Sequence, residues 1–212
     1  MNKRNVLIIG DSYSTFEGYI PEGYEPFYKK DGREDNDVSR VEETWWHQVI
    51  AETGANLALN NSWSGSTIGF TGYGGADCSQ TSSFIYRLEQ LIENGFFEEN
   101  EINTVFVFGG TNDDWSEAPL GKPEYSHWEK RDLYYVLPAI SYFLRKLKDT
   151  LHDANIYCLI NTELKQEITD CFKESCSRYG IKAVTFDGIE KDAGHPTVKG
   201  MQDIKDQVME LL

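Results

Sequence analysis

The sequence lacks several features that would point to particular classes of protein. It has few cysteines, and none of them forms a C-x-x-C pair or lies at metal-ligand spacing from a histidine; they are Cys78, Cys158, Cys171 and Cys176. This pattern favours reduced, mostly buried thiols and predicts neither a disulfide scaffold nor a metal site. No apolar stretch approaches the roughly 20 residues that span a bilayer. The apolar run before Gly10 is too short for a signal-peptide core. These absences favour a cytoplasmic protein without a membrane partner, although a signal peptide removed earlier would leave the same pattern.

Basic residues are also scarce. Lysine and arginine number 20 against 35 aspartates and glutamates, which gives a formal net charge of −15. Such a surface repels nucleic-acid phosphates and anionic membranes, so we expect no nucleic-acid partner, and a neutral substrate fits better. The 212 residues, 40% of them hydrophobic and 13% aromatic, are enough for one domain with a substantial core. We predict a single domain over residues 1–212.

Apolar runs alternate with amphipathic stretches along the chain. Runs rich in β-branched and aromatic residues predict five strands, at 6–9, 56–60, 104–110, 155–161 and 181–186. Helical spacing predicts a helix after each strand, at 42–53, 83–93, 129–151 with Pro138 as a candidate kink, 162–179 and 197–212. Because no β-hairpin signal interrupts this alternation, we predict an α/β fold in which helices cover both faces of a parallel sheet.

One connection is unusually long. Residues 13–41 separate the first strand from the first helix and are rich in tyrosine, glycine and glutamate. Loops of this length without secondary structure are often lids or binding loops. A solvated surface insertion explains the segment equally well, and the sequence leaves both interpretations open.

Polar residues follow four of the predicted strands. Ser12 comes after the first strand, Gly65 after the second and Asn112 after the third, while Asp192 and His195 follow the fifth. In open parallel sheets, ligands bind outside the carboxyl ends of the strands. We therefore expect these residues to meet at one edge of the sheet.

These residue types match the needs of acyl transfer. A serine hydroxyl requires an adjacent base, for which histidine is suited. A carboxylate must then fix the tautomer of the imidazole and stabilise the imidazolium that forms. The backbone N–H groups of Ser12 and Gly65 and the side-chain amide of Asn112 could stabilise an oxyanion. Serine, base and amide donors complete this chemistry without a metal or a cofactor, and we expect neither.

The motifs resemble those of a known family. Gly10-Asp11-Ser12, Gly65, Gly109-x-x-Asn112-Asp113 and Asp192-x-x-His195-Pro196 are similar to the four sequence blocks of the SGNH hydrolases, or GDSL-type esterases, in the same order along the whole chain. The resemblance implies a three-layer, flavodoxin-like α/β/α fold. It also implies that Ser12 is the nucleophile, His195 the base, Asp192 its orienting acid, and Ser12, Gly65 and Asn112 the oxyanion hole. Tyr13 departs from the family pattern, in which leucine or isoleucine usually follows the serine, and we expect it to narrow the mouth of the site.

The sequence leaves the roles of several other aspartates and histidines open. Asp187 could orient His195 in place of Asp192. Asp11 is expected to shape the turn around Ser12, and Asp113 to brace its loop. The other histidines have structural or surface explanations; they are His47, His127 and His152.

Two further alternatives come from another functional class. A flavodoxin-like protein could bind a phosphate at the first turn through Ser12, Ser14 and Thr15, but that mode requires a helix to begin directly after the strand. A hydrolase scaffold used only for binding would not need the complete set of Ser12, His195, Asp192 and Asn112. A fluorophosphonate probe should label Ser12 only in an esterase.

The expected substrate is a small-molecule or carbohydrate ester. Aromatic residues near the proposed site, among them Tyr13, Trp63 and Trp115, suit stacking on sugar rings but also an acyl chain. The sequence shows neither an apolar lid helix nor a basic headgroup site. A short-chain ester, in particular an O-acetyl group on a carbohydrate, therefore fits best, and a lysophospholipase or thioesterase acting on longer chains is the alternative. The sequence does not indicate an oligomeric state.

Overall fold

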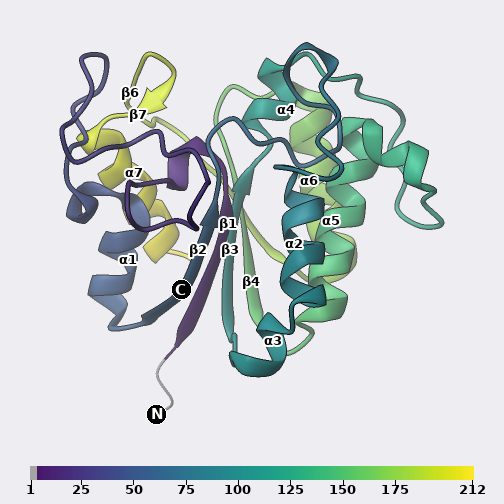
Figure 1. Ribbon diagram of the computed structural model, residues 1–212, viewed down its shortest axis with the longest axis horizontal. Coiled ribbons are helices and arrows are strands. Elements are labelled where there is room, and N and C mark those ends of the chain that lie inside the picture. The colour runs from purple at the N-terminus through teal and green to yellow at the C-terminus, as the bar shows by residue number, and fades with distance from the viewer. Residues whose placement is uncertain (1–3) are drawn as a thin grey trace.

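A sheet of five parallel strands forms the centre of the molecule. The computed structural model describes residues 4–212. The strand order is β2-β1-β3-β4-β5 (Figure 1), with β1 at Asn5–Gly10, β2 at Asn56–Ser62, β3 at Thr104–Gly109, β4 at Asn155–Ile160 and β5 at Lys182–Thr185. All five predicted strands are present, and this order is that of a flavodoxin-like fold. The predicted fold class is confirmed.

Both faces of the sheet are buried, which explains the continuous apolar runs. In β1, Val6 and Ile8 pack with one hydrophobic cluster. Leu7 and Ile9, which alternate with them, pack with the other cluster on the opposite face. Since side chains alternate along a strand, a strand covered on both faces must be apolar at every position.

Helices cover the two faces in separate layers (Figure 1). One layer contains α1 (Trp45–Thr53) and α7 (Val198–Met209). The other contains α2 (Phe84–Glu93), α5 (Val136–Thr150) and α6 (Gln166–Tyr179). Two short helices and four 3₁₀ turns lie in the connections: α3 (Phe96–Glu99), α4 (Thr111–Trp115), η1 (Ser12–Ser14), η2 (Val41–Glu43), η3 (Tyr73–Gly75) and η4 (Lys130–Tyr134).

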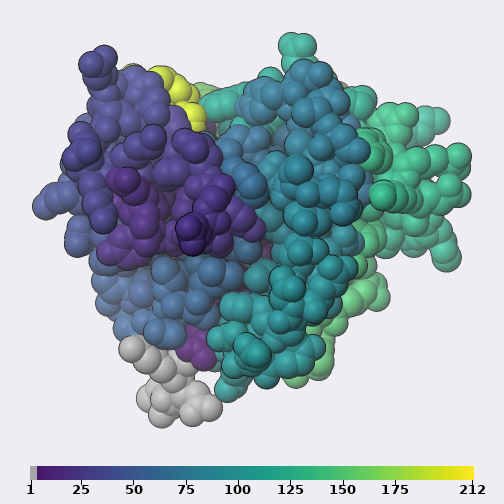
Figure 2. Space-filling model, in the orientation of Figure 1, coloured from purple at the N-terminus to yellow at the C-terminus, as the bar shows by residue number. Residues whose placement is uncertain are grey.

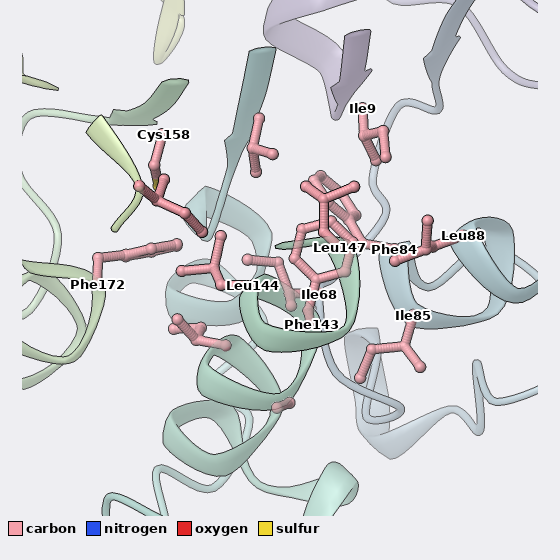
Figure 3. Packing of buried hydrophobic residues seen from close by; sticks show 14 of the residues in the cluster. Ile9, Ile68, Phe84, Ile85, Leu88, Phe143, Leu144, Leu147, Cys158 and Phe172 are labelled. Carbon is pink, nitrogen blue, oxygen red and sulfur yellow. The ribbon is translucent and has the colours of Figure 1, made fainter. Parts of the chain in front are cut away.

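The larger layer encloses the main hydrophobic core. Figure 3 shows Phe143 of α5 packed toward Phe84 of α2, and Phe172 of α6 on the other side near Cys158 of β4. The rings of Phe84 and Phe143 meet edge to face, with centroids 5.7 Å apart. This geometry is a favoured arrangement for aromatic pairs.

All five predicted helices begin later in the structure than the sequence predicted, at Trp45, Phe84, Val136, Gln166 and Val198. The predicted helix at 129–151 is divided into η4 and α5, and Pro138 lies in the first turn of α5, where it causes no kink. A proline is tolerated there because the N–H groups of the first turn have no intrahelical acceptor. The last helix begins at Val198, and Thr197 is its N-cap, accepting a hydrogen bond from Gly200 N–H through Oγ1 at 3.1 Å.

A small hairpin was not predicted. It consists of β6 (Lys191–Asp192) and β7 (His195–Pro196), which pair antiparallel. The two residues between them, Ala193 and Gly194, have positive φ angles of 45° and 78°, as a tight hairpin turn requires. A two-residue strand gives too short a pattern for recognition in the sequence.

Three further expectations concern the whole chain. The predicted domain over 1–212 includes residues 1–3, which lie outside the described residues. All four cysteines are free thiols, and Cys78 is half-buried while the other three are buried. Within residues 4–212, no helix has the length and apolar character needed to cross a membrane.

Candidate active site

Ser12 lies in a sharp turn at the carboxyl end of β1. A Cβ atom on Gly10 would lie 2.7 Å from Ser62 Oγ, which is too close for a side chain, so this position favours glycine. Asp11 caps the 3₁₀ turn, because its Oδ1 accepts a hydrogen bond from Tyr13 N–H at 3.1 Å. Ser12 is therefore the first residue of a turn whose direction its neighbours determine.

The hydroxyl of Ser12 contacts the imidazole of His195. Ser12 Oγ and His195 Nε2 are 2.9 Å apart, and His195 Nδ1 lies 3.2 Å from the backbone carbonyl of Ala193. A carbonyl only accepts hydrogen bonds, so it favours the tautomer with the proton on Nδ1. Nε2 is then free to accept the serine proton, as a general base must.

The surroundings of His195 favour its neutral form. Burial lowers the pKa of His195 below its usual range, because an imidazolium loses hydration there. The positive charges of Arg33 and Lys191 lower this pKa further. The Ala193 carbonyl and the carboxylate of Asp35 act in the opposite direction. The base is thus ready to accept a proton at neutral pH.

The structure does not bring the predicted orienting acid to the imidazole. Asp192 pairs with His195 through the backbone of the hairpin, but its side chain is exposed. Among residues 4–212, no carboxylate forms an ion pair or a hydrogen bond with His195. Asp187 is also exposed, and its backbone is bonded to Gln207. At Nδ1 the structure therefore has the Ala193 carbonyl where the family resemblance implied a carboxylate.

The predicted oxyanion donors converge on the same edge. Gly65 is the third residue of a turn closed by a hydrogen bond from Ser66 N–H to Trp63 O at 3.2 Å. Its φ of 78° requires glycine at this position. Within residues 4–212, the backbone N–H groups of Ser12 and Gly65 donate no hydrogen bond. Both are available to a substrate oxygen.

The side chain of Asn112 is held in one orientation. Its Oδ1 accepts a hydrogen bond from Tyr73 OH at 2.8 Å, and its Nδ2 donates to Ser66 O at 3.0 Å. The amide has two N–H groups, so one remains for an oxyanion. Tyr73 thereby determines which end of the amide faces the turn that contains Gly65.

A buried arginine connects the loops of the site. Arg87 of α2 donates hydrogen bonds to Gly10 O and Ser66 Oγ, both at 3.1 Å, and to Asn61 Oδ1 at 2.7 Å. Burial lowers the pKa of Arg87 to about 10, so its charge persists at neutral pH. One guanidinium thus joins the ends of β1 and β2 to the turn that contains Gly65.

Two buried carboxyl groups support the same loops. Asp113 accepts hydrogen bonds from Ile68 N–H at 2.9 Å and Gly69 N–H at 3.2 Å, which agrees with the expected bracing role. Burial raises the pKa of Asp11 to about 7 and that of Asp113 to about 6. Burial thus disfavours the charged form of both groups, Asp11 more than Asp113, which reduces the negative charge close to a developing oxyanion.

The three aromatic candidates differ in their surroundings. Tyr13 is fully buried and donates a hydrogen bond to Gly194 O at 2.5 Å, so it holds the His195 turn and cannot narrow the mouth of the site as expected. Trp63 is half-buried and stacks on Tyr24 with centroids 4.2 Å apart. Trp115 is 46% exposed and lies edge-on to His195 at 5.7 Å.

Sequence reasoning missed four residues of this site. Asn161 directly follows β4, and its Nδ2 donates to Thr111 Oγ1 at 2.9 Å and to Tyr13 OH at 3.3 Å. The rule that selected the ends of the other strands would have found it. Arg87, Tyr73 and Phe27 had no such signal, since each lies in a helix or a long loop far from the motifs.

Other features of the structure lie apart from these residues. A groove of about 740 Å³ lies between residues 120–125 and α6, and none of the candidate active-site residues lines it. No group of three or more His, Cys, Asp or Glu side chains placed to hold a metal ion occurs within residues 4–212.

Comparisons with known proteins identify the family of this chain. Residues 4–212 match the model of the GDSL-like lipase/acylhydrolase family. A structure from Bacteroides ovatus ATCC 8483, classed as a GDSL-like lipase, is 39% identical with a TM-score of 0.92, covering 100% of this chain and 98% of the other. One from Bacteroides uniformis ATCC 8492, of the same class, is 44% identical with a TM-score of 0.91, covering 99% and 95%.

A more distant structure shares the fold. An acetyl xylan esterase from the rumen bacterium Butyrivibrio proteoclasticus is 16% identical with a TM-score of 0.62, covering 100% of this chain and 64% of the other. No curated protein matches the chain. The family match over nearly the whole length shows that this chain is an ester-hydrolysing enzyme and belongs to the GDSL-like lipase/acylhydrolase family.

Proposed function

We propose that the enzyme hydrolyses short-chain carboxylic esters, in particular O-acetyl groups on carbohydrates, through an acyl-enzyme on Ser12. The observation that carries the proposal is the 2.9 Å contact between Ser12 Oγ and His195 Nε2. Because the Ala193 carbonyl favours a proton on Nδ1, Nε2 can accept the serine proton as Oγ attacks the acyl carbon.

The two half-reactions follow from the same groups. In the first, the carbonyl oxygen becomes an oxyanion that accepts hydrogen bonds from Ser12 N–H, Gly65 N–H and the Asn112 amide. The protonated His195 then donates its Nε2 proton to the leaving alcohol oxygen, which leaves the acyl group on Ser12. In the second, His195 deprotonates a water that attacks the acyl carbon, and the proton returns to Ser12 Oγ as the acid departs.

Exposed aromatic rings beside the site support a carbohydrate substrate. Trp115 is 46% exposed next to His195, and Tyr73 is 47% exposed while bonded to Asn112. An amphipathic ring with one free side suits the apolar face of a sugar ring. The acetyl xylan esterase of the same fold is consistent with this choice, and we expect neither a nucleic-acid nor a membrane partner.

Substrate assays test this proposal. We expect the enzyme to hydrolyse p-nitrophenyl acetate faster than the octanoate and to release acetate from acetylated xylan or acetylated sugars. Faster turnover of octanoate without acetate release would contradict it and favour a lysophospholipase or thioesterase. Failure of a fluorophosphonate probe to label Ser12 would instead contradict an acyl-enzyme on this residue.

Substitution of Asp192 tests the orienting acid that the family resemblance implies. Because its carboxylate does not contact the imidazole, we expect Asp192→Asn to lower kcat less than about tenfold, whereas loss of the acid of a working triad costs about 10⁴-fold. Asp187→Asn is the matched comparison. A loss near that of His195→Ala in either variant would assign the acid to that residue.

The pH profile of the enzyme follows from the environment of His195. The general base must be unprotonated, and its pKa is lowered by burial and by the nearby cations. We therefore expect the acid limb of kcat/KM below about pH 6.5, the ordinary value for histidine. Arg33→Gln removes one of these cations and should move the limb to higher pH. A wild-type limb above pH 7 would contradict this assignment.

A further inference from the structure

The imidazole of His195 has no carboxylate to fix its orientation. Two hydrogen bonds hold its nitrogens, one with Ser12 Oγ and one with the Ala193 carbonyl. These two contacts fix two points only, and rotation of the ring about the line that joins Ser12 Oγ and Ala193 O would keep both distances. Another contact must determine its plane.

A phenylalanine ring lies flat against this imidazole. The centroids of Phe27 and His195 are 3.6 Å apart and their planes differ by 6°. Two parallel rings at this distance are in full van der Waals contact, so tilting one drives it into the other. The rings of Tyr13 and Trp115 approach His195 edge-on at 5.3 and 5.7 Å. Among the aromatic rings of residues 4–212, only that of Phe27 stacks on a face of the imidazole.

Phe27 is itself held from its other side. The guanidinium carbon of Arg33 lies 4.1 Å from the centre of the Phe27 ring, and since the imidazole covers one face, Arg33 covers the opposite one. Asp35 accepts two hydrogen bonds from this guanidinium, at 2.8 and 3.0 Å. The backbone N–H of Phe27 donates to Thr15 Oγ1 at 2.8 Å. The ring is clamped between the imidazole and a paired arginine.

The insertion that carries Phe27 is bonded to the His195 segment. Tyr28 OH and Asn36 Nδ2 donate to Pro196 O at 3.0 and 3.1 Å. Asp37 accepts a hydrogen bond from Val198 N–H at 2.8 Å. Figure 1 places the insertion next to β6 and β7, and in Figure 2 the yellow C-terminal residues emerge directly beside its surface. These contacts hold the insertion and the base together.

We propose that the insertion 13–41 positions the catalytic base, and that Phe27 fixes the plane of His195, the orienting task of the carboxylate in a Ser-His-Asp triad. The proposal rests on the proposed ester hydrolysis at Ser12. It differs from both earlier interpretations of the insertion: a segment bonded to the residues beside the base is not merely a solvated surface loop, and it cannot open as a lid without displacing the base. Phe27 is a positioning residue: it orients the imidazole of His195 but, unlike a carboxylate, supplies no negative charge to stabilise the imidazolium.

Substitution of Phe27 tests this role. Small misplacements of reacting groups cost up to about 10²-fold in rate, so we expect Phe27→Ala to lower kcat about 10–100-fold and leave KM within about twofold. Fluorophosphonate labelling of Ser12 should slow in parallel. The acid limb of kcat/KM should move to higher pH, because the imidazole gains solvent. Phe27→Tyr keeps the flat ring and should restore at least half of the wild-type kcat.

Matched variants separate this role from general stability. Phe97→Ala removes another half-buried phenylalanine, in α3 at the opposite end of the sheet (Figure 1), and should leave kcat unchanged. If Phe27→Ala does not fold, Phe27→Leu decides the question, because leucine fills space without a flat face. About a tenfold loss in Phe27→Leu supports the proposal.

Failure of the positioning role and failure of the proposed function would give different results. If the wild type hydrolyses esters and is labelled at Ser12 while Phe27→Ala, or Phe27→Leu in its place, matches it within twofold, the positioning role is wrong and the proposed function stands. If the wild type neither hydrolyses p-nitrophenyl acetate nor reacts with the probe, the proposed function fails as well.

Discussion

Replacing Ser12 or His195 with alanine is expected to lower ester turnover about 10⁴-fold or more, because the two residues act as one unit. Without the hydroxyl there is no attacking atom. Without the imidazole the hydroxyl has no base, since Nε2 is the group that contacts Oγ, at 2.9 Å. Steady-state hydrolysis of p-nitrophenyl acetate measures both losses.

The two variants should also fail in the same way. Because each removes the same proton transfer, the double variant should be scarcely slower than either single one. Both should keep the fold, which thermal unfolding can confirm, and neither should react with a fluorophosphonate. A Ser12→Ala variant with a tenth or more of the wild-type kcat would show that the nucleophile lies elsewhere.

Asn112→Ala is expected to lower kcat about 10²–10³-fold while KM changes little, as for loss of one oxyanion donor. The amide is held with Oδ1 on Tyr73 OH and Nδ2 toward Ser66 O. It therefore requires no reorganisation when negative charge develops on the substrate carbonyl. Ester hydrolysis over a range of substrate concentrations separates the two constants.

A half-buried asparagine far from the site provides the control for this variant. Asn100 lies at the end of α3 and bonds only the carbonyl of Phe96, so Asn100→Ala should leave kcat unchanged. Equal kcat in Asn112→Ala and the wild type would remove Asn112 from the oxyanion hole. A change confined to KM would indicate that it binds the substrate without stabilising the transition state.

Much of the fold was predictable from local patterns. The five strands were recognisable because a strand buried on both faces must be apolar at successive positions, as in 6–9 and 104–110. The strand-end rule then selected Ser12, Gly65, Asn112 and His195, which the structure brings to one edge of the sheet. The ends of helices were less certain: Pro138 begins α5 instead of kinking it, because a first turn and a kink have the same local sequence signal.

The surroundings of the base could not be predicted in this way. Asp192 is close to His195 in sequence, yet the hairpin at 191–196 leaves its carboxylate exposed and turns the Ala193 carbonyl toward Nδ1. Tyr13 was expected at the mouth of the site and is buried under the His195 turn. In both cases backbone geometry decided where a neighbouring side chain points.

The sequence by itself determined the parallel sheet, the residues at its carboxyl edge and the family to which they point, because periodicity and strand ends are properties of consecutive residues. Only the tertiary structure decided that Phe27 covers the face of His195 and that Arg87 joins the ends of β1 and β2. Those contacts link residues from distant parts of the chain. Their energies depend on distances and ring planes that no local pattern records.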